Sequence, residues 1–307
     1  MAKFDIKDIK GVIPATLTCF DENEKVDEKR TRELIEFLVS SGVNGLYITG
    51  STGMCFTMTT EQRKKSTEIV IDQVAGRVPV IVHIGDIGTA KSIELARHAE
   101  SVGADAISSV PPFYWGFSPD AIYNYYKDIA ESVSIPMVVY NIALAGLMDR
   151  TLVRKIADIP NVKGLKYTAR SHDEMGSIKR ELGADFMIYS GCDEMAFSGF
   201  SFGADGIIGS FYNCIPELYM KIYNAYKNND IKAGMEYQAI ADEFIFAALK
   251  YNGLSSIYDL LKIRGIDAGE AIRPFIRNSP QNVESLKQEV SKIRDEFKTH
   301  ELDIFGI

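Results

Sequence analysis

Short apolar runs alternate with helical patterns along most of this chain. The runs cover residues 11–18, 45–49, 78–84, 106–110, 136–140, 162–168, 185–190 and 206–209. Segments with helical spacing follow them at residues 29–41, 60–74, 89–102, 119–132, 151–158, 172–182, 195–202 and 216–228. Strands that alternate with helices pair in parallel and are joined by right-handed crossovers. The sequence therefore predicts an α/β protein with one parallel sheet.

The number of repeating units decides between two such folds. Eight strand–helix units favour a closed (β/α)8 TIM barrel over an open, doubly wound sheet. We expect residues 1–229 to form this catalytic barrel. Residues 230–307 contain helical patterns only, at residues 233–250, 255–263 and 283–298. They predict a C-terminal helical extension that packs on the barrel or on a partner subunit.

Composition excludes several classes of function. The net charge of -8 disfavours nucleic acid as a partner. No apolar run reaches the roughly 18 residues of a transmembrane helix, and the first residues lack the apolar segment of a secretory signal. The four cysteines are scattered without a C-x-x-C pair, which is typical of reduced thiols. We expect a cytoplasmic protein without a membrane partner.

One lysine stands near the end of an apolar strand. Lys166 lies at the carboxyl end of the run 162–168, where barrel enzymes carry their active sites. Burial lowers a lysine's pKa, and a neutral amine can attack a ketone to form a Schiff base. The alternative is a structural ion pair with a carboxylate. Asp193 and Glu194 are expected on the loop after the next strand and outside the barrel interior, so the nucleophile is favoured.

Other polar side chains follow the ends of neighbouring strands. Ser51 and Thr52 lie in a Gly-Ser-Thr-Gly turn that could bind a carboxylate or phosphate, or could simply turn the chain. Tyr140 is either a core aromatic or a proton relay to a Schiff base. Tyr114 stands beside the only tryptophan, in a segment that suits an aromatic plug or a subunit interface. Ser210 places another hydroxyl after the eighth strand.

The acidic pair after the seventh strand has three interpretations. Asp193 and Glu194 could bind a metal, cap the next helix, or accept hydrogen bonds from a polyol. The metal interpretation is weak because the histidines show no ligand spacing: they are His83, His98, His172 and His300. We expect no metal site.

Three of these motifs occur together in one known family. The Gly-Ser-Thr-Gly turn at 50–53, Tyr140-Asn141 and the Gly-Leu-Lys of residues 164–166 resemble the N-acetylneuraminate lyase/dihydrodipicolinate synthase family of class I aldolases. The tracts 191–194 and 209–213 resemble those of its sialic acid lyases. The synthases carry an arginine shortly after Tyr-Asn, where this chain has Ala-Leu-Ala at 143–145.

The resemblance implies a role for each matching residue. Lys166 would form the Schiff base, Tyr140 would relay protons, and Tyr114 would complete the relay of a neighbouring subunit in a homotetramer. Ser51 and Thr52 would bind the substrate carboxylate. The polyol tail would be faced by Thr168, Gly191, Asp193, Glu194 and Ser210. Two departures stand out: Met54 replaces the family's glutamate, and the segment after Asn141 lacks the usual proline and is one residue shorter.

The expected activity is retro-aldol cleavage of N-acetylneuraminate to N-acetylmannosamine and pyruvate. No cofactor is expected, because the lysine amine itself supplies the electron sink. One alternative is another pyruvate-dependent 2-oxo acid aldolase or dehydratase, acting on a deoxy sugar acid or resembling dihydrodipicolinate synthase. The other alternative is a barrel that binds sugar acids without catalysis.

Overall fold

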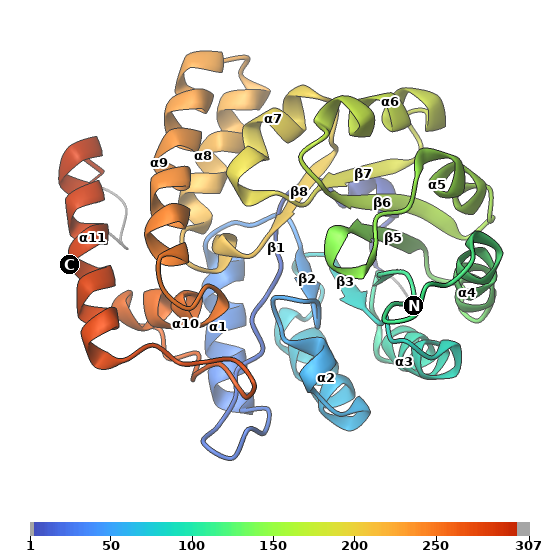
Figure 1. Ribbon diagram of the computed structural model, residues 1–307, viewed down its shortest axis with the longest axis horizontal. Helices are drawn as coiled ribbons and strands as arrows, with labels where there is room; N and C mark the ends of the chain where they lie inside the picture. The colour runs from blue at the N-terminus through green and yellow to red at the C-terminus, as the bar shows by residue number, and fades with distance from the viewer. Residues whose placement is uncertain (1–2, 300–307) are drawn as a thin grey trace.

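Eight parallel strands form the centre of the molecule. The computed structural model describes residues 3–299 and arranges the strands in the order β1-β8-β7-β6-β5-β4-β3-β2 (Figure 1). The strands are β1 (Gly11–Pro14), β2 (Leu46–Ile48), β3 (Val80–His83), β4 (Ala106–Ser109), β5 (Met137–Ile142), β6 (Val162–Thr168), β7 (Met187–Ser190) and β8 (Gly206–Gly209). A parallel bridge between Ala15 and Tyr47 joins β1 to β2 and brings the two edges of the sheet together. The predicted (β/α)8 barrel is confirmed.

One helix follows each strand and covers the outside of the barrel (Figure 1). These helices are α1 (Glu28–Ser40), α2 (Thr60–Val74), α3 (Thr89–Val102), α4 (Pro119–Glu131), α5 (Arg150–Ala157), α6 (His172–Leu182), α7 (Ala196–Ser201) and α8 (Pro216–Lys227). Side-chain caps mark several helix starts: Asp27, Thr59, Ser118 and Asp149 each accept a hydrogen bond from a backbone N–H of the first turn.

The first strand shows the largest error of the sequence prediction. The apolar run 11–18 predicts a strand of that length, but β1 ends at Pro14. Beyond Ala15, Leu17 N–H donates to the side chain of Asn213 at 3.2 Å instead of to a neighbouring strand. This segment is buried as a loop whose backbone is satisfied by side chains, and an apolar run does not distinguish such a loop from a strand.

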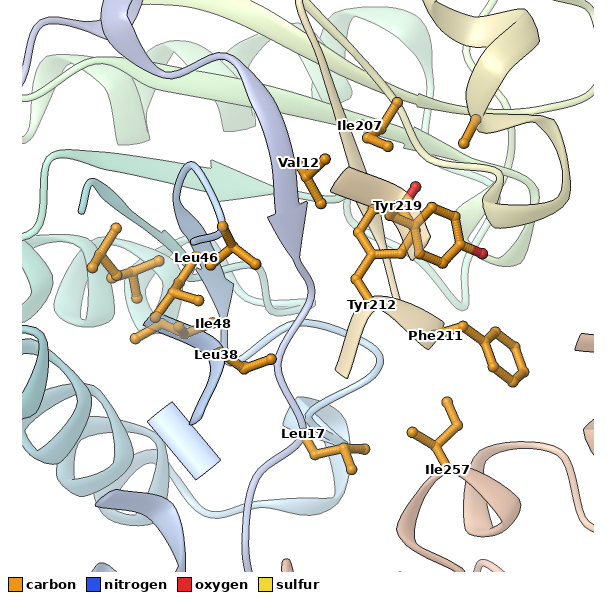
Figure 2. Packing of buried hydrophobic residues seen from close by; sticks show 14 of the residues in the cluster. Val12, Leu17, Leu38, Leu46, Ile48, Ile207, Phe211, Tyr212, Tyr219 and Ile257 are labelled. Atoms are coloured by element: carbon orange, nitrogen blue, oxygen red, sulfur yellow. The ribbon is translucent and has the colours of Figure 1, made fainter. Parts of the chain in front are cut away.

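Alternating side chains divide the core into two layers. One set of buried residues points into the barrel, including Ile13, Tyr47, Val138, Tyr140 and Tyr189. The other set faces the helices, and Figure 2 shows part of it around Val12, Ile207 and Tyr219. Because strand side chains alternate between the two faces, every second residue of a strand belongs to the interior. On β6 this alternation puts Lys166 inside the barrel, between the outward-facing Leu165 and Tyr167.

Within the described residues, three helices follow the barrel and lie together on one side of it, in orange and red in Figure 1. They are α9 (Ile231–Leu249), α10 (Leu254–Ile263) and α11 (Pro280–Phe297), and α9 packs along α8. We propose the boundary between barrel and extension after residue 229, where α8 has ended and Asp230 caps α9. Among residues 3–299, no helix is both long and apolar enough to cross a membrane.

Candidate active site

A cavity of about 460 Å³ opens at the carboxyl ends of the strands. Ligand pockets commonly enclose about 300–1,000 Å³, so the space suits a small organic molecule. Seven residues singled out in the sequence line it together: Ser51, Thr52, Tyr140, Lys166, Thr168, Gly191 and Ser210. They come from the ends of β2, β5, β6, β7 and β8, so the fold gathers into one site groups that are far apart in the chain.

Lys166 lies inside this cavity among aromatic rings. Its side chain is 4 % exposed, and Nζ is 4.3 Å from the centre of the Tyr47 ring and 4.2 Å from that of Tyr140. Within residues 3–299, no ion pair or hydrogen bond of Nζ occurs. Burial lowers the pKa of Lys166 to about 7, although the charge of Asp193 opposes this shift. A large fraction of the amine is therefore neutral, and nucleophilic, near neutral pH.

Tyr140 is the direct neighbour of Lys166 across the sheet. The two residues pair in the β5–β6 register, so both side chains point into the barrel at the same level. Burial raises the pKa of the Tyr140 phenol well above its usual value, while Thr168 and Ser51 lower it. The phenol consequently holds its proton at neutral pH, and its ring lies beside Nζ.

Hydroxyl groups line the side of the cavity formed by β2 and β8. Thr52 Oγ1 and Ser210 Oγ are 2.7 Å apart and share a hydrogen bond, which ties the turn after β2 to the end of β8. Gly50 allows this turn to pack on an aromatic ring, because an added Cβ would lie 2.7 Å from Tyr47 Cε1. These hydroxyl groups could donate hydrogen bonds to an anionic group bound in the cavity.

Gly191 follows β7 at a point where the backbone passes close to two site residues. An added Cβ would overlap with Thr168 Oγ1 and would lie 3.2 Å from Lys166 Cε. Any side chain at this position would therefore displace both residues. The structure explains Gly191 by this close approach.

The acidic pair occupies a different environment from the cavity wall. Asp193 and Glu194 begin the short helix η4 (Asp193–Met195), and neither lines the cavity. Asp193 is buried, and its Oδ2 accepts a hydrogen bond of 2.7 Å from the backbone N–H of Phe211. As predicted, Asp193 lies on the loop after β7, but its charge raises the pKa of Lys166, and burial raises its own pKa to about 7. The carboxylate thus fixes the turn after β8, next to Ser210.

Tyr114 lies away from the cavity of its own chain. Its side chain is 82 % exposed and contacts Trp115, which is 63 % exposed, with ring centres 4.8 Å apart. Of the three catalytic candidates, the structure therefore brings Lys166 and Tyr140 together and leaves Tyr114 on the surface.

The outer wall of the cavity is apolar. The side chains that form it, none of them among the predicted site residues, include Met54, Phe56, Phe113, Leu144, Leu254 and Phe275. Leu254 begins α10 and Phe275 follows it, so the C-terminal extension contributes to the site. No local pattern in the sequence could link these two residues to a strand end more than 40 residues away.

Two residues near Lys166 were missed in the sequence. Tyr47 faces the lysine from β2, and His83 ends β3 with its ring centre 6.1 Å from that of Tyr140. The alternation of β2 marks Tyr47 as an interior residue, and the strand-end rule, applied to the third strand, indicates His83. His83, His98 and His172 belong to no group of three or more potential metal ligands within residues 3–299, and His300 lies outside these residues.

Comparisons with known proteins agree with this geometry. Residues 8–293 match the model of the Dihydrodipicolinate synthetase family. N-acetylneuraminate lyase 2 of Escherichia coli O6:H1 is 36% identical over 293 residues, which cover 94% of this chain and 96% of that protein. The wild-type sialic acid aldolase of Ruminococcus gnavus superposes with a TM-score of 0.91 at 32% identity, covering 95% of this chain and 99% of the other.

A dihydrodipicolinate synthase from Bacillus anthracis is also similar, with a TM-score of 0.88 at 25% identity, covering 92% and 97% of the two chains. The family match extends over the whole barrel and most of the C-terminal helices. This chain therefore belongs to the dihydrodipicolinate synthetase family and is an enzyme of its lyase group, which includes the N-acetylneuraminate lyases.

Proposed function

We propose that this enzyme is a Schiff-base aldolase that cleaves N-acetylneuraminate to N-acetylmannosamine and pyruvate. The observation that carries the proposal is the buried amine of Lys166, which is held between two tyrosine rings without an ion pair within the described residues. The names of the relatives support it, since several are N-acetylneuraminate lyases or sialic acid aldolases. One solved relative, from Ruminococcus gnavus, is described as a catalytic lysine mutant.

The first half of the reaction forms a cation on the lysine. Neutral Lys166 Nζ adds to the C2 ketone of the open-chain substrate, and loss of water gives an iminium ion. Ser51 and Thr52 donate hydrogen bonds to the carboxylate beside this carbon. The faces of the Tyr47 and Tyr140 rings stabilise the positive charge, since aromatic faces attract cations.

The second half uses this cation as an electron sink. The C4 hydroxyl loses its proton through Tyr140 and the substrate carboxylate, and the C3–C4 bond breaks. Its electron pair moves to the iminium nitrogen, which leaves an enamine of pyruvate on Lys166 and releases the aldehyde. Protonation at C3 restores an iminium ion, and water then releases pyruvate and the free amine.

Borohydride reduction in the presence of pyruvate tests the chemistry directly. Hydride addition to the imine should leave a stable 1-carboxyethyl group on the peptide that contains Lys166, detected by mass spectrometry. The exposed Lys163 of the same strand is the internal control and should remain unmodified. An adduct on another lysine, or no adduct, contradicts the proposed nucleophile.

A second candidate function changes the substrate and keeps the Schiff base. The apolar outer wall, with Phe113 and Leu144, offers few partners for a long polyol, which favours a less hydroxylated 2-oxo acid. An aldolase or dehydratase acting on a deoxy sugar acid fits this wall. Dihydrodipicolinate synthesis fits less well, because Ala143 to Ala145 supply no arginine for a second carboxylate.

Pyruvate release from a panel of acids distinguishes these candidates. N-acetylneuraminate should be cleaved with a higher kcat/KM than 2-keto-3-deoxygluconate if the first proposal holds. The reverse order supports the second candidate. Tight binding of either acid without turnover would instead indicate a sugar-acid binding barrel.

We also propose a homotetramer in which Tyr114 reaches the active site of a neighbouring subunit. The exposed aromatic pair Tyr114–Trp115 supports this, because such side chains usually pack against a partner. The four free cysteines fit a reducing compartment and support a cytoplasmic location.

A further inference from the structure

The turn that carries Ser51 and Thr52 begins in an unfavourable backbone conformation. Thr49 directly follows β2 and has a φ of 51°, in the left-handed region. A β-branched residue is a genuine outlier there, because its side chain crowds the backbone. Such a conformation persists where the surroundings hold it in place, and such sites cluster at functional centres. The groups that hold Thr49 therefore bear on the position of the two hydroxyls.

Two hydrogen bonds join His83 to Thr49, one through the backbone carbonyl of His83 and one through its ring. Thr49 Oγ1 donates to His83 O at 2.9 Å, and His83 Nδ1 lies 3.2 Å from Thr49 O. On the far side of the ring, the backbone N–H of Val110 donates to Nε2 at 3.3 Å. A carbonyl can only accept and an amide N–H can only donate, so the ring is neutral and carries its proton on Nδ1. The imidazole thus joins the ends of β2, β3 and β4.

A buried arginine supports this arrangement from the helix side. Arg63 of α2 is 3 % exposed and donates to His83 O at 2.9 Å and to Gly85 O at 3.0 Å. His83 O therefore accepts from both Thr49 and Arg63, which fixes the backbone of β3 where the imidazole leaves it. Burial of the ring, and after it the guanidinium charge, lowers the pKa of His83 far below its usual value.

His83 also touches the aromatic side chains around the lysine without entering the cavity. Its ring centre lies 6.1 Å from that of Tyr140 and 6.2 Å from that of Tyr47, while the imidazole is absent from the cavity wall. The two tyrosine rings in turn flank Lys166 Nζ. Any influence of His83 on the reaction must therefore act through its neighbours.

We propose that His83 is a positioning residue that holds the Thr49 turn, and with it the hydroxyls of Ser51 and Thr52, at the distance from Lys166 that a 2-oxo acid requires. The Nδ1–H bond to Thr49 O is the contact that does this. The inference rests on the proposed function for the role of the two hydroxyls, but the coupling between His83 and the turn can be measured without any substrate.

Two substitutions of similar size separate the roles of the two ring nitrogens, Nδ1 and Nε2. His83→Asn places an amide where Nδ1 stood and can still donate to Thr49 O. His83→Gln reaches the place of Nε2, where it can accept from Val110 N–H but cannot donate to Thr49 O. A residue that merely fills space would give similar results for both variants, because each removes the ring.

The first measurement is the pyruvate concentration that gives half-maximal borohydride trapping on Lys166. We expect it to rise about tenfold in His83→Gln and to stay within about twofold of the unaltered protein in His83→Asn, in line with the loss of one hydrogen bond. Limiting trapping rates at saturating pyruvate should differ less than these concentrations. Equal changes in both variants would overturn the proposal.

The second measurement is hydrogen exchange in the turn without ligand. The amides of Met54 and Cys55, bonded to Ser51 O and Gly50 O, report on its order. They should exchange about tenfold faster in His83→Gln than in His83→Asn. If the unaltered protein forms no pyruvate adduct, the proposed function fails, and this exchange ratio alone decides the role of His83; a ratio near one rejects it.

Discussion

Two lysines are withdrawn from water at opposite ends of the barrel, with opposite surroundings. Near the amino ends of β7 and β8, Lys179 donates to Asp205 at 2.7 Å and to Phe186 O at 2.9 Å. Near the carboxyl ends, Lys166 Nζ lies over the rings of Tyr47 and Tyr140, and within residues 3–299 it has no ion pair. Asp205 also accepts from the backbone of Ile188, so the first site is a complete polar network.

The difference agrees with a general rule for such barrels: residues at the amino ends of the strands stabilise the fold, and residues at the carboxyl ends form the active site. A lysine whose hydrogen bonds are satisfied contributes to stability. An unsatisfied one is a destabilising group that becomes available for bond formation. The comparison predicts that the same substitution, lysine to methionine, has contrasting effects at the two sites.

The largest expected effect is on catalysis. Lys166→Met should reduce the rate of aldol cleavage by about 10³-fold or more, because among residues 3–299 no other lysine lines the cavity to form the iminium ion. Lys179→Met should change kcat less than about twofold. Steady-state assays of pyruvate release compare the two variants, with Lys163→Met as the exposed control on β6. Residual cleavage close to that of the unaltered enzyme in Lys166→Met would refute the Schiff base.

The next effect concerns stability at the amino end of the barrel. Lys179→Met should lower the free energy of unfolding by about 2 kcal/mol, since it leaves Asp205 partly buried and unpaired. This value lies below that of a fully buried pair because both side chains keep some solvent contact. Urea unfolding at pH 7 measures it. An unchanged midpoint would show that water replaces the lysine without loss.

At the carboxyl end the same change should stabilise. The pKa of Lys166 is about 7 in the folded protein and near 10.5 when unfolded, so between these values the unfolded chain binds a proton that the folded chain lacks. Unfolding free energy then rises with pH across this window. Lys166→Met should remove that slope and should be more stable than the unaltered protein at pH 7, by about 1–3 kcal/mol.

Urea unfolding of both proteins at pH 7 and pH 9.5 tests this prediction. The advantage of Lys166→Met should shrink at the higher pH, because less free energy is then needed to remove the proton that the lysine carries in the unfolded chain. An advantage that does not depend on pH would assign the gain to apolar packing of the methionine instead of to the removed charge.

The sequence predicted the part of this comparison that depends on local pattern. Strand alternation and the strand-end rule located Lys166, Tyr140 and the hydroxyl turn, because both rules need only the position of a residue within its own strand. They could not place Leu254 and Phe275 at the cavity, since these come from the extension and meet the barrel through tertiary packing.

Asp193 shows the same limit at one residue. A strand-end carboxylate suggests a ligand or a helix cap, but the bond to Phe211 N–H depends on how the turn after β8 folds back toward β7. The burial of this carboxylate is accompanied by a bond to a backbone donor 18 residues away. The sequence therefore identified Asp193 as an acidic residue after the seventh strand, but it could not predict that this residue would be buried and would affect the pKa of Lys166.

The smallest expected effect tests how much Asp193 offsets the burial of the lysine. The rate of pyruvate trapping should fall as pH drops below about 7, because protonated Lys166 cannot attack the ketone. Asp193→Asn removes a charge that raises the pKa of this amine, so the midpoint of the pH profile should move to lower pH, by up to about one unit.

Glu194→Gln is the matched control, since Glu194 is not among the groups that shift the pKa of Lys166, and the midpoint of this variant should stay in place. An equal midpoint for Asp193→Asn and the unaltered enzyme would mean that Asp193 is already protonated when the lysine titrates. Burial between the tyrosine rings would then set the reactivity of Lys166 alone, and the contrast with Lys179 and its charged partner would be sharper still.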